Sequence, residues 1–167
     1  MIRSFRRIGA LGAATVAAVT FAAAAPVAAA PAVPADGFEF TLYAKEVPAD
    51  EDETPDLSPE VGDSLAFAED LSRTKGGETV GRDGVGCTVV RGGETADLLC
   101  VGTYVLNGGP GGQLTGQTLL SVTPEDEAPA AFDIAVTGGT GDFKDARGWI
   151  RSTPDGDYSR LEFHITR

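Results

Sequence analysis

Apolar and polar side chains alternate along most of the chain beyond residue 36, and this two-residue period is typical of β-strands. Glycine, proline and asparagine interrupt the alternation at short intervals and indicate turns. The pattern predicts eight strands: Phe38–Val47, Asp63–Ser72, Thr79–Arg91, Asp97–Leu106, Gln113–Thr123, Ala131–Val136, Ala146–Thr153 and Tyr158–Thr166. Short strands without a helix indicate an antiparallel sandwich or a closed barrel. Because eight strands close around side chains or one small ligand, we expect an all-β, eight-stranded antiparallel β-barrel over residues 36–167.

Residues 1–35 have the pattern of a secretory signal peptide. An apolar, alanine-rich run follows three basic residues, Arg3, Arg6 and Arg7. The small residues after the run place cleavage after Ala30, Ala32 or Ala35. Glycines within the run and prolines after it favour a cleaved signal over the alternative, a retained membrane anchor. We therefore expect a secreted, extracellular protein with one mature domain.

The chain is strongly acidic, with a net charge of −12 over 167 residues. Removal of residues 1–35 takes away three arginines and no acid, which leaves a net charge of −15. Nucleic acid and anionic membranes would repel such a surface, so neither is an expected partner of the mature protein. The net charge of the protein does not repel a small uncharged apolar ligand.

Both cysteines flank a predicted hairpin in the exported part. A two-residue turn at Gly93 and Glu94 would place Cys87 directly opposite Cys100. Export brings thiols into an oxidising compartment. We therefore expect a Cys87–Cys100 disulfide, and the alternative is two buried free thiols.

Strand alternation places two carboxylates on faces that are otherwise apolar. Glu46 ends one face of the first predicted strand, and Glu69 interrupts one face of the second. Carboxylates inside an apolar barrel have raised pKa values and can transfer protons, so these two are candidate catalytic residues. The candidate ligand contacts are Phe40, Leu42, Phe67 and Tyr104. The alternative is that both glutamates lie in water at the barrel mouth, or that a bulge turns them outward.

Motifs for a metal or an organic cofactor are missing from the sequence, and we expect neither. A single histidine, His164, cannot form a histidine-rich site, and it is expected on the outer face of the last strand. The glycine-rich run Gly138–Gly141 is not followed by the helix of a dinucleotide site. The acidic segment Pro48–Gly62 is interpreted as a solvated loop, with a loose calcium site or a lid over the barrel as alternatives.

A glycine-rich stretch near the C-terminus carries a family resemblance. Residues 138–148, GGTGDFKDARG, resemble the GGTG-x-F-[KR]-x-A-R-G signature of plant dirigent proteins and, more loosely, the TGG-x-G-x-F segment of plant allene oxide cyclases. Four further segments resemble the cyclases in the same order: Phe40–Tyr43, Gly62–Phe67, Val85–Cys87 and Gln113–Gln117. The resemblance implies a small β-barrel that cyclises or steers a reactive apolar molecule without a cofactor.

The resemblance also implies which residues act. The plant cyclases have a catalytic glutamate where this chain has Ala44, so allene oxide cyclase activity itself is not expected. Their two interior asparagines align with Glu46 and Glu69, and the acidic and arginine residues of dirigent proteins match Asp142 and Arg147. Plant relatives form trimers, which implies a homo-oligomer.

Two classes of function remain open. One is an isomerase, a cyclase or a dirigent-like stereochemical guide for an apolar small molecule. The other is a non-catalytic ligand carrier or a stable extracellular barrel. The missing glutamate favours the second class, whereas an interior carboxylate pair favours the first.

Overall fold

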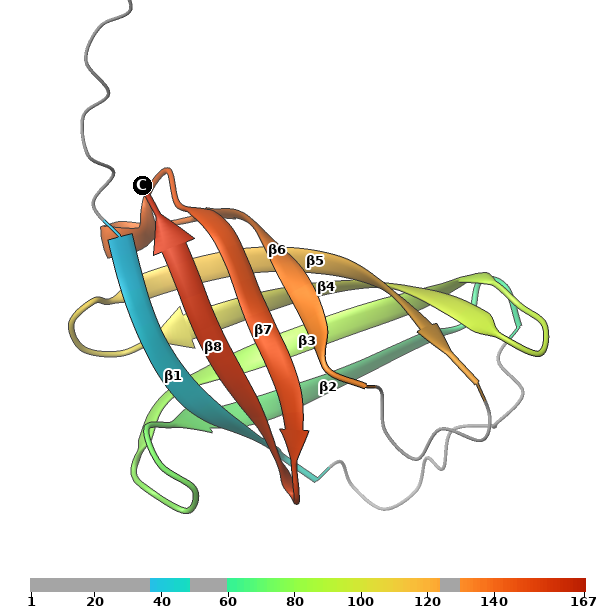
Figure 1. Ribbon diagram of the computed structural model, residues 1–167, viewed down its shortest axis with the longest axis horizontal. Helices are drawn as coiled ribbons and strands as arrows, with labels where there is room; N and C mark the ends of the chain where they lie inside the picture. The colour runs from blue at the N-terminus through green and yellow to red at the C-terminus, as the bar shows by residue number, and fades with distance from the viewer. Residues whose placement is uncertain (1–36, 49–59, 124–129) are drawn as a thin grey trace, which may run out of the picture. The chain divides into compact units, whose positions relative to one another are not determined.

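The computed structural model describes residues 37–48, 60–123 and 130–167. They form eight strands and one 3-10 turn: β1 (Gly37–Glu46), β2 (Ser64–Ser72), β3 (Thr79–Arg91), β4 (Ala96–Leu106), β5 (Gly112–Val122), β6 (Phe132–Gly139), η1 (Gly141–Phe143), β7 (Arg147–Asp155) and β8 (Tyr158–Thr166). Each strand pairs antiparallel with the next, and β8 pairs back with β1, so the sheet is a closed barrel (Figure 1). The predicted fold class is confirmed.

All eight predicted strands are present, and their ends lie within three residues of the predicted ends. The alternation also assigned the two faces of β8 correctly. Leu161, Phe163 and Ile165 are at most 3% exposed. The intervening His164 lies on the outer face, where its ring stacks on Trp149 with the centroids 4.0 Å apart.

An aromatic cluster closes the end of the barrel where β1 begins and β8 ends. The ring of Phe143 is fully buried and packs edge-on against Phe38, with the centroids 5.3 Å apart. Phe40 stacks on Phe163 at a centroid distance of 4.5 Å. Such rings bury large apolar areas and prefer these stacked and edge-on geometries. The cluster therefore forms the hydrophobic core at this end.

The glycine-rich stretch makes the corner between β6 and β7 that delivers Phe143 into this cluster. Gly148 has a φ of +131°, which L side chains rarely adopt, and a Cβ there would collide with the carbonyl of His164. A Cβ on Gly139 would lie 2.6 Å from the carbonyl oxygens of Gln113 and Phe143. The residues that resemble the dirigent signature thus close the barrel.

The Cys87–Cys100 disulfide is confirmed, although the turn beside it differs from the predicted one. Cys87 and Cys100 face each other on β3 and β4, and their sulfur atoms are 2.03 Å apart. The last pair of the hairpin is Arg91 with Asp97, so the turn is longer than two residues. A bulge between Val89 and Arg91 restores the register that a two-residue turn would produce. The predicted turn is therefore wrong and the predicted pairing correct.

Several predictions concern residues outside the described ranges. The predicted signal peptide at residues 1–35 lies there, as does most of the acidic segment, at residues 49–59. Within the described ranges, no helix has the length and apolar character needed to cross a lipid bilayer.

Candidate functional site

The barrel contains a cavity of about 430 Å³ at the end away from the Phe143 cluster. At this end β2 to β5 run past their neighbours (Figure 1). β1 pairs with β2 only from Tyr43 to Glu46, and β6 pairs with β5 only from Leu114 to Gln117. The inner faces of the projecting strands form the cavity wall. The volume is within the range of small-molecule sites in proteins.

The cavity wall is mainly apolar. Large side chains from six strands line it, among them Leu65, Phe67, Val85, Leu98, Phe132 and Leu161. The Cys87–Cys100 disulfide also forms part of the wall. A wall of this kind favours a ligand with an apolar framework, because burying apolar surface is worth about 25 cal/mol per Å².

A row of polar side chains crosses this apolar wall. Glu46 on β1 pairs with Glu69 on β2, Glu69 pairs with Asp83 on β3, and Asp83 pairs with Tyr104 on β4. Cross-strand partners have their Cβ atoms about 5 Å apart, so the four side chains are neighbours. Glu46, Glu69 and Tyr104 line the cavity. We call these four residues the carboxyl row.

Burial increases along the carboxyl row from the solvent towards the interior. Glu46 is exposed, Glu69 is half-buried, and Asp83 and Tyr104 are only 4% and 3% exposed. Neither carboxyl oxygen of Asp83 has a hydrogen-bond partner of ordinary geometry among the described residues. A buried carboxyl without partners is costly when it is charged, so this position favours a neutral acid.

The pKa values of the row follow from this burial. Burial raises the pKa of Asp83 to about 8, and the charge of the facing Glu69 adds to the effect. The pKa of Glu69 is also raised, first by burial and further by the charge of Glu46, while the Asp83 carboxyl acts in the opposite direction. Burial raises the pKa of Tyr104 as well, and the negative charges of Asp83 and Glu69 add to this effect. At neutral pH, Asp83 and Tyr104 therefore keep their protons.

Solved structures of three proteins resemble this barrel. A pyocyanin demethylase has a TM-score of 0.57 and 26% sequence identity, over 76% of this chain and 99% of its own. Two pterocarpan synthase dirigent proteins have TM-scores of 0.60 and 0.55, each at 17% identity, over 89% and 78% of this chain and 97% and 94% of their own. No protein-family model and no curated protein sequence matches the chain.

The chain has the allene oxide cyclase/dirigent-like barrel fold.

The dirigent-like barrel brings together most of the predicted site residues. Glu46 and Glu69 are direct cross-strand partners, and both line the cavity with Phe67, Tyr104 and the disulfide. The exposure of Glu46 partly matches the alternative that the glutamates lie at the mouth. The catalytic role of the glutamates stays a prediction.

Two predicted ligand contacts lie elsewhere in the dirigent-like barrel. Phe40 and Leu42 belong to the hydrophobic core and line only a second cavity of about 50 Å³. They share the inward face of β1 with Glu46, but β1 runs from the closed end to the cavity, and only its last inward residues reach the large cavity. Phe40 and Leu42 therefore lie outside the larger cavity, and their role as ligand contacts stays a prediction.

The two candidates from the glycine-rich signature are also placed away from the cavity. Asp142 is exposed, and its Oδ2 accepts a hydrogen bond of 2.9 Å from the backbone N–H of Gly111. The exposed Arg147 donates to the carbonyl of Ala146 at 2.7 Å and makes no ion pair with Asp142 in the described part of the chain. Neither side chain lines the cavity. Asp142 instead ties the β6–β7 corner to the loop before β5, so the geometry gives it a structural role.

Asp83 was missed by the sequence reasoning. It lies on the inward face of β3, between Gly81 and Val85, so the alternation that identified Glu46 and Glu69 would also have identified it. Alternation alone does not give the register between β2 and β3, which aligns Asp83 with Glu69.

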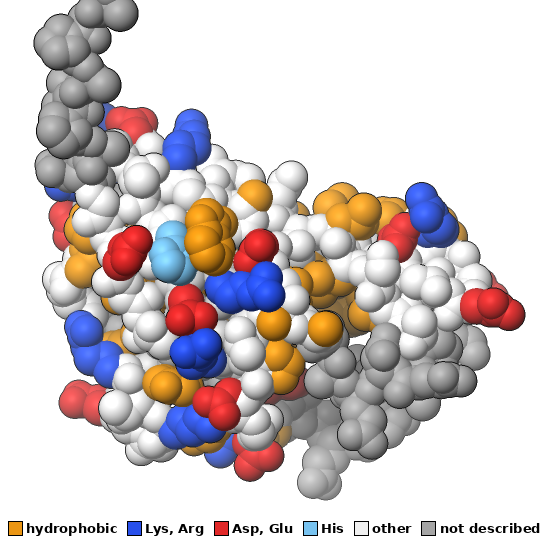
Figure 2. All heavy atoms as spheres, viewed as in Figure 1, with side chains coloured by type: hydrophobic (Ala, Val, Ile, Leu, Met, Phe, Trp, Pro, Cys, Tyr) orange, Lys and Arg blue, Asp and Glu red, His pale blue; other side chains and the backbone are white. Residues whose placement is uncertain are grey.

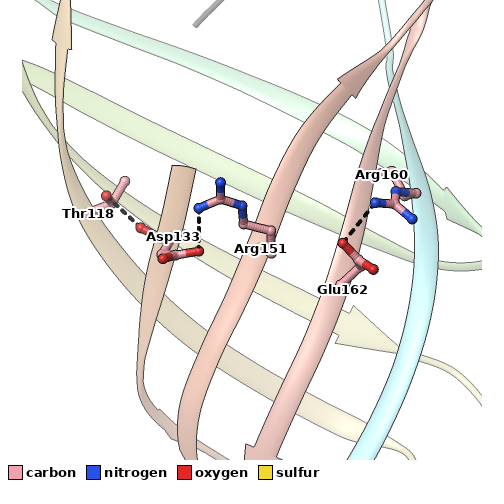
Figure 3. Close-up of polar contacts among 5 residues, drawn as sticks. All are labelled: Thr118, Asp133, Arg151, Arg160 and Glu162. Carbon is pink, nitrogen blue, oxygen red and sulfur yellow. Dashed lines mark hydrogen bonds and ion pairs between the residues drawn. The ribbon is translucent and has the colours of Figure 1, made fainter. Parts of the chain in front are cut away.

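The outer surface of the dirigent-like barrel carries ordinary ion pairs. Arg151 contacts Asp133, and Arg160 contacts Glu162, each at 3.0 Å (Figure 3). Acidic and basic side chains are interspersed over this face (Figure 2). Among the described residues, no group of three or more His, Cys, Asp or Glu side chains is arranged to hold a metal ion. The outer carboxylates provide matched controls for those inside.

Proposed function

We propose that this dirigent-like barrel binds an apolar small molecule in its cavity and isomerises it by proton transfer. The observation that carries the proposal is the carboxyl row: Glu69, with a raised pKa, lines a mainly apolar cavity, and Asp83, whose pKa is also raised, is its direct cross-strand partner. Perturbed carboxyls that converge on a cavity are typical of acid–base sites.

Glu69 is the proposed base, because its carboxyl lines the cavity. It removes a proton from one position of the ligand and returns it at another, so that one bond to hydrogen breaks, one forms, and a double bond shifts. No electrons leave or enter, and no co-reactant is needed. A general base with a pKa near the working pH is efficient in such a step.

Two neighbours support this base. Asp83 keeps its proton and so limits the negative charge beside Glu69, which makes it a positioning residue. Tyr104 lines the cavity, and its hydroxyl is proposed to donate a hydrogen bond to an oxygen that becomes negative during the shift. The neighbours named for pyocyanin demethylation and pterocarpan synthesis support a small organic substrate.

A carrier without catalytic activity is the second candidate. Ala44 is fully buried in the cavity wall at the position where the resembled cyclases have their catalytic glutamate. A wall that lacks this group is consistent with binding alone.

The proposed function is tested with a panel of apolar small molecules in a thermal-shift assay, followed by product analysis of every ligand that binds. Glu69→Gln is expected to keep binding and to lose turnover at least a hundredfold, since it removes the base. Glu162→Gln, on the outer surface, is the control and is expected to keep both. Binding without turnover in the parent would favour the carrier, and the absence of any binding would contradict both candidates.

We also propose that the protein is secreted. The predicted signal at residues 1–35 and the disulfide support this, because disulfides persist in oxidising compartments. Expression with the native leader should give a processed chain outside the cytoplasm. An unprocessed chain that stays inside the cell would contradict secretion.

A further inference from the structure

We propose that the cavity selects ligands that combine an apolar framework with one positive charge, such as a protonated amine or a quaternary nitrogen. This inference rests on the proposed binding function and names the ligand class of the same site. It follows from which charged groups the cavity wall contains and which it lacks.

The described part of the cavity wall is acidic and contains no basic side chain. Glu46, Glu69 and Asp157 line it, and Asp83 lies directly beside Glu69. None of the described residues that line the cavity is a lysine, an arginine or the histidine. The ion pairs found in the described part of the chain all involve carboxylates other than these four.

Two lysines contact Tyr158 of the cavity wall but do not line the cavity themselves. Lys45 and Lys75 lie over the ring of Tyr158, 5.5 and 6.0 Å from its centroid, and Lys75 also pairs with Asp155. Neither lysine lines the cavity. Among the described residues, the negative charge of the wall is therefore not balanced by an ion pair.

This charge pattern separates three kinds of ligand. An anion in the cavity of about 430 Å³ would lie near the carboxylates of Glu46 and Glu69, and like charges repel each other. A neutral apolar ligand gains binding free energy only from the burial of its apolar surface. A cation gains free energy from burial and also supplies a positive partner for the half-buried Glu69, which makes no ion pair among the described residues.

The buried Asp83 carboxyl is the second, independent observation. It is 96% removed from solvent, and both of its oxygens lack a hydrogen-bond partner of ordinary geometry among the described residues. Its register places it on the inward face between two residues of the cavity wall, Glu69 and Tyr104. Such a carboxyl is poised to share its proton with Glu69 or to lose it when a positive charge arrives.

Aromatic rings in the same wall suit a cation as well. Phe67, Phe132 and Tyr104 line the cavity. A cation over an aromatic face is stabilised by about 0.5–2 kcal/mol when it is desolvated. Carboxylates and ring faces together form a typical environment for an organic cation.

Binding of a cation should be linked to release of a proton. A positive charge beside Glu69 and Asp83 favours their charged forms, so affinity should rise as the pH rises towards 8, where Asp83 titrates in the free protein. The other titratable groups that face the pair are Glu46 from β1, Tyr104 from β4, and Asp157 and Tyr158 at the start of β8. Tyr104 stays neutral over this range, since its pKa is raised.

The test uses three probes of nearly equal shape and different charge. These are 1-methylquinolinium (positive), 1-methylnaphthalene (neutral) and 1-naphthoate (negative), titrated into the purified full chain at pH 6 to 9. We expect the cation to bind about tenfold tighter than the neutral probe at pH 8 and the anion to bind weakest. The affinity of the cation should increase several-fold from pH 6 to pH 8.5, and that of the neutral probe should not change.

Variants assign the preference to the carboxyl row. The double change Glu69→Gln and Asp83→Asn should remove the preference for the cation and its pH dependence, while the neutral probe still binds. Glu69→Gln alone serves if the double variant fails to fold. The outer-surface change Glu162→Gln, which leaves the row intact, should keep the preference.

The outcomes distinguish this inference from the proposed function. If the neutral probe or the anion binds as tightly as the cation, the inference fails and binding of an apolar ligand stands. If the cation preference persists in both carboxyl variants, it comes from the acidic surface as a whole, and the inference also fails. If none of the three probes binds, the proposed function and the inference fail together.

Discussion

At the scale of single residues, Asp83 is the most unusual side chain of the protein. Its carboxyl is 4% exposed, has no hydrogen-bond partner of ordinary geometry among the described residues and is held neutral, although an ordinary aspartate is charged at neutral pH. Groups of this kind destabilise a fold when they ionise, and they are retained where they have a function. The carboxyl row therefore has a measurable effect on stability as well as on chemistry.

The first prediction concerns the stability of Asp83→Asn. The pKa of Asp83 is about 8 in the folded protein and about 3.8 in the unfolded chain. Between pH 4 and pH 8, the Asp83 carboxyl therefore carries a proton in the folded state but not in the unfolded state. This group makes the protein less stable as the pH rises from about 4 to 8, by roughly 1 kcal/mol per pH unit. Asp83→Asn removes this loss of stability. The free energy of unfolding of the variant, measured by urea denaturation, should therefore increasingly exceed that of the parent from pH 4 to pH 8.

The control for this prediction is Asp133→Asn, which changes an exposed aspartate on the outer surface. Its stability relative to the parent should be nearly independent of pH over the same range. A constant difference between Asp83→Asn and the parent from pH 4 to pH 8 would mean that Asp83 titrates normally.

At the scale of elements, the strands form the hydrophobic core at one end of the barrel and the ligand cavity at the other. At the closed end, the corner between β6 and β7 inserts Phe143 against β1. At the open end, the β3–β4 hairpin runs past its neighbours and is held by the disulfide. Stability and binding can therefore be separated by mutation.

Phe143→Ala should destabilise the protein and leave the cavity intact. Removing a fully buried ring costs about 3–5 kcal/mol of unfolding free energy. Phe143 does not line the cavity, so the affinity for a cavity ligand should stay the same in the folded fraction. Guanidinium denaturation measures the loss of stability, and a binding titration measures the affinity for the ligand. A large change in affinity with unchanged stability would reverse the assigned roles.

The disulfide should contribute to stability through the hairpin. Cys87 and Cys100 are separated by 13 positions, and closing a loop of this size stabilises by about 3 kcal/mol in the chain-entropy model. The double change of both cysteines to serine should lower the free energy of unfolding by about this amount. Thiol labelling of the folded, oxidised parent should find no free thiol, and full labelling of both cysteines would contradict the bond.

Much of the fold could be predicted because side-chain direction alternates strictly along a strand. That rule yielded eight strands, the faces of β8 and the neighbouring positions of Glu46 and Glu69. It did not yield the bulge at Val90, which depends on the turn, or the stagger between strands. Without the stagger, Phe40 and Leu42 were predicted as ligand contacts, and the alignment of Asp83 with Glu69 could not be predicted. Asp142 and Arg147 were chosen from a signature whose glycines serve the corner between β6 and β7.

At the scale of the whole molecule, the outer faces of β4 and β5 carry a group of exposed apolar side chains that we propose to be covered. Leu99 and Leu119 are direct partners on β4 and β5, and with Val101 they are 43 to 58% exposed. Exposed apolar groups of this kind commonly mark contact surfaces. The resemblance to trimeric plant proteins makes a second copy of the chain the expected partner.

The corresponding prediction is a homo-oligomer that Leu119→Lys weakens, because the charge would be buried in the contact. Light scattering over a range of protein concentrations measures the mass. Thr103→Lys changes the same outer face of β4 outside the apolar group and should leave the mass unchanged. A monomeric parent at all concentrations would contradict the assembly.

The central claim is that Glu69 and Asp83 form a coupled carboxyl pair at a ligand cavity. Carbon-detected NMR titration of their side-chain carboxyls in the full chain tests it most directly. The account predicts a midpoint near pH 8 for Asp83 and a raised midpoint for Glu69. It also predicts that Glu69→Gln lowers the midpoint of Asp83, since the charge that faces it is removed. Ordinary midpoints for both carboxyls, with no response of Asp83 to the change at Glu69, would contradict the account.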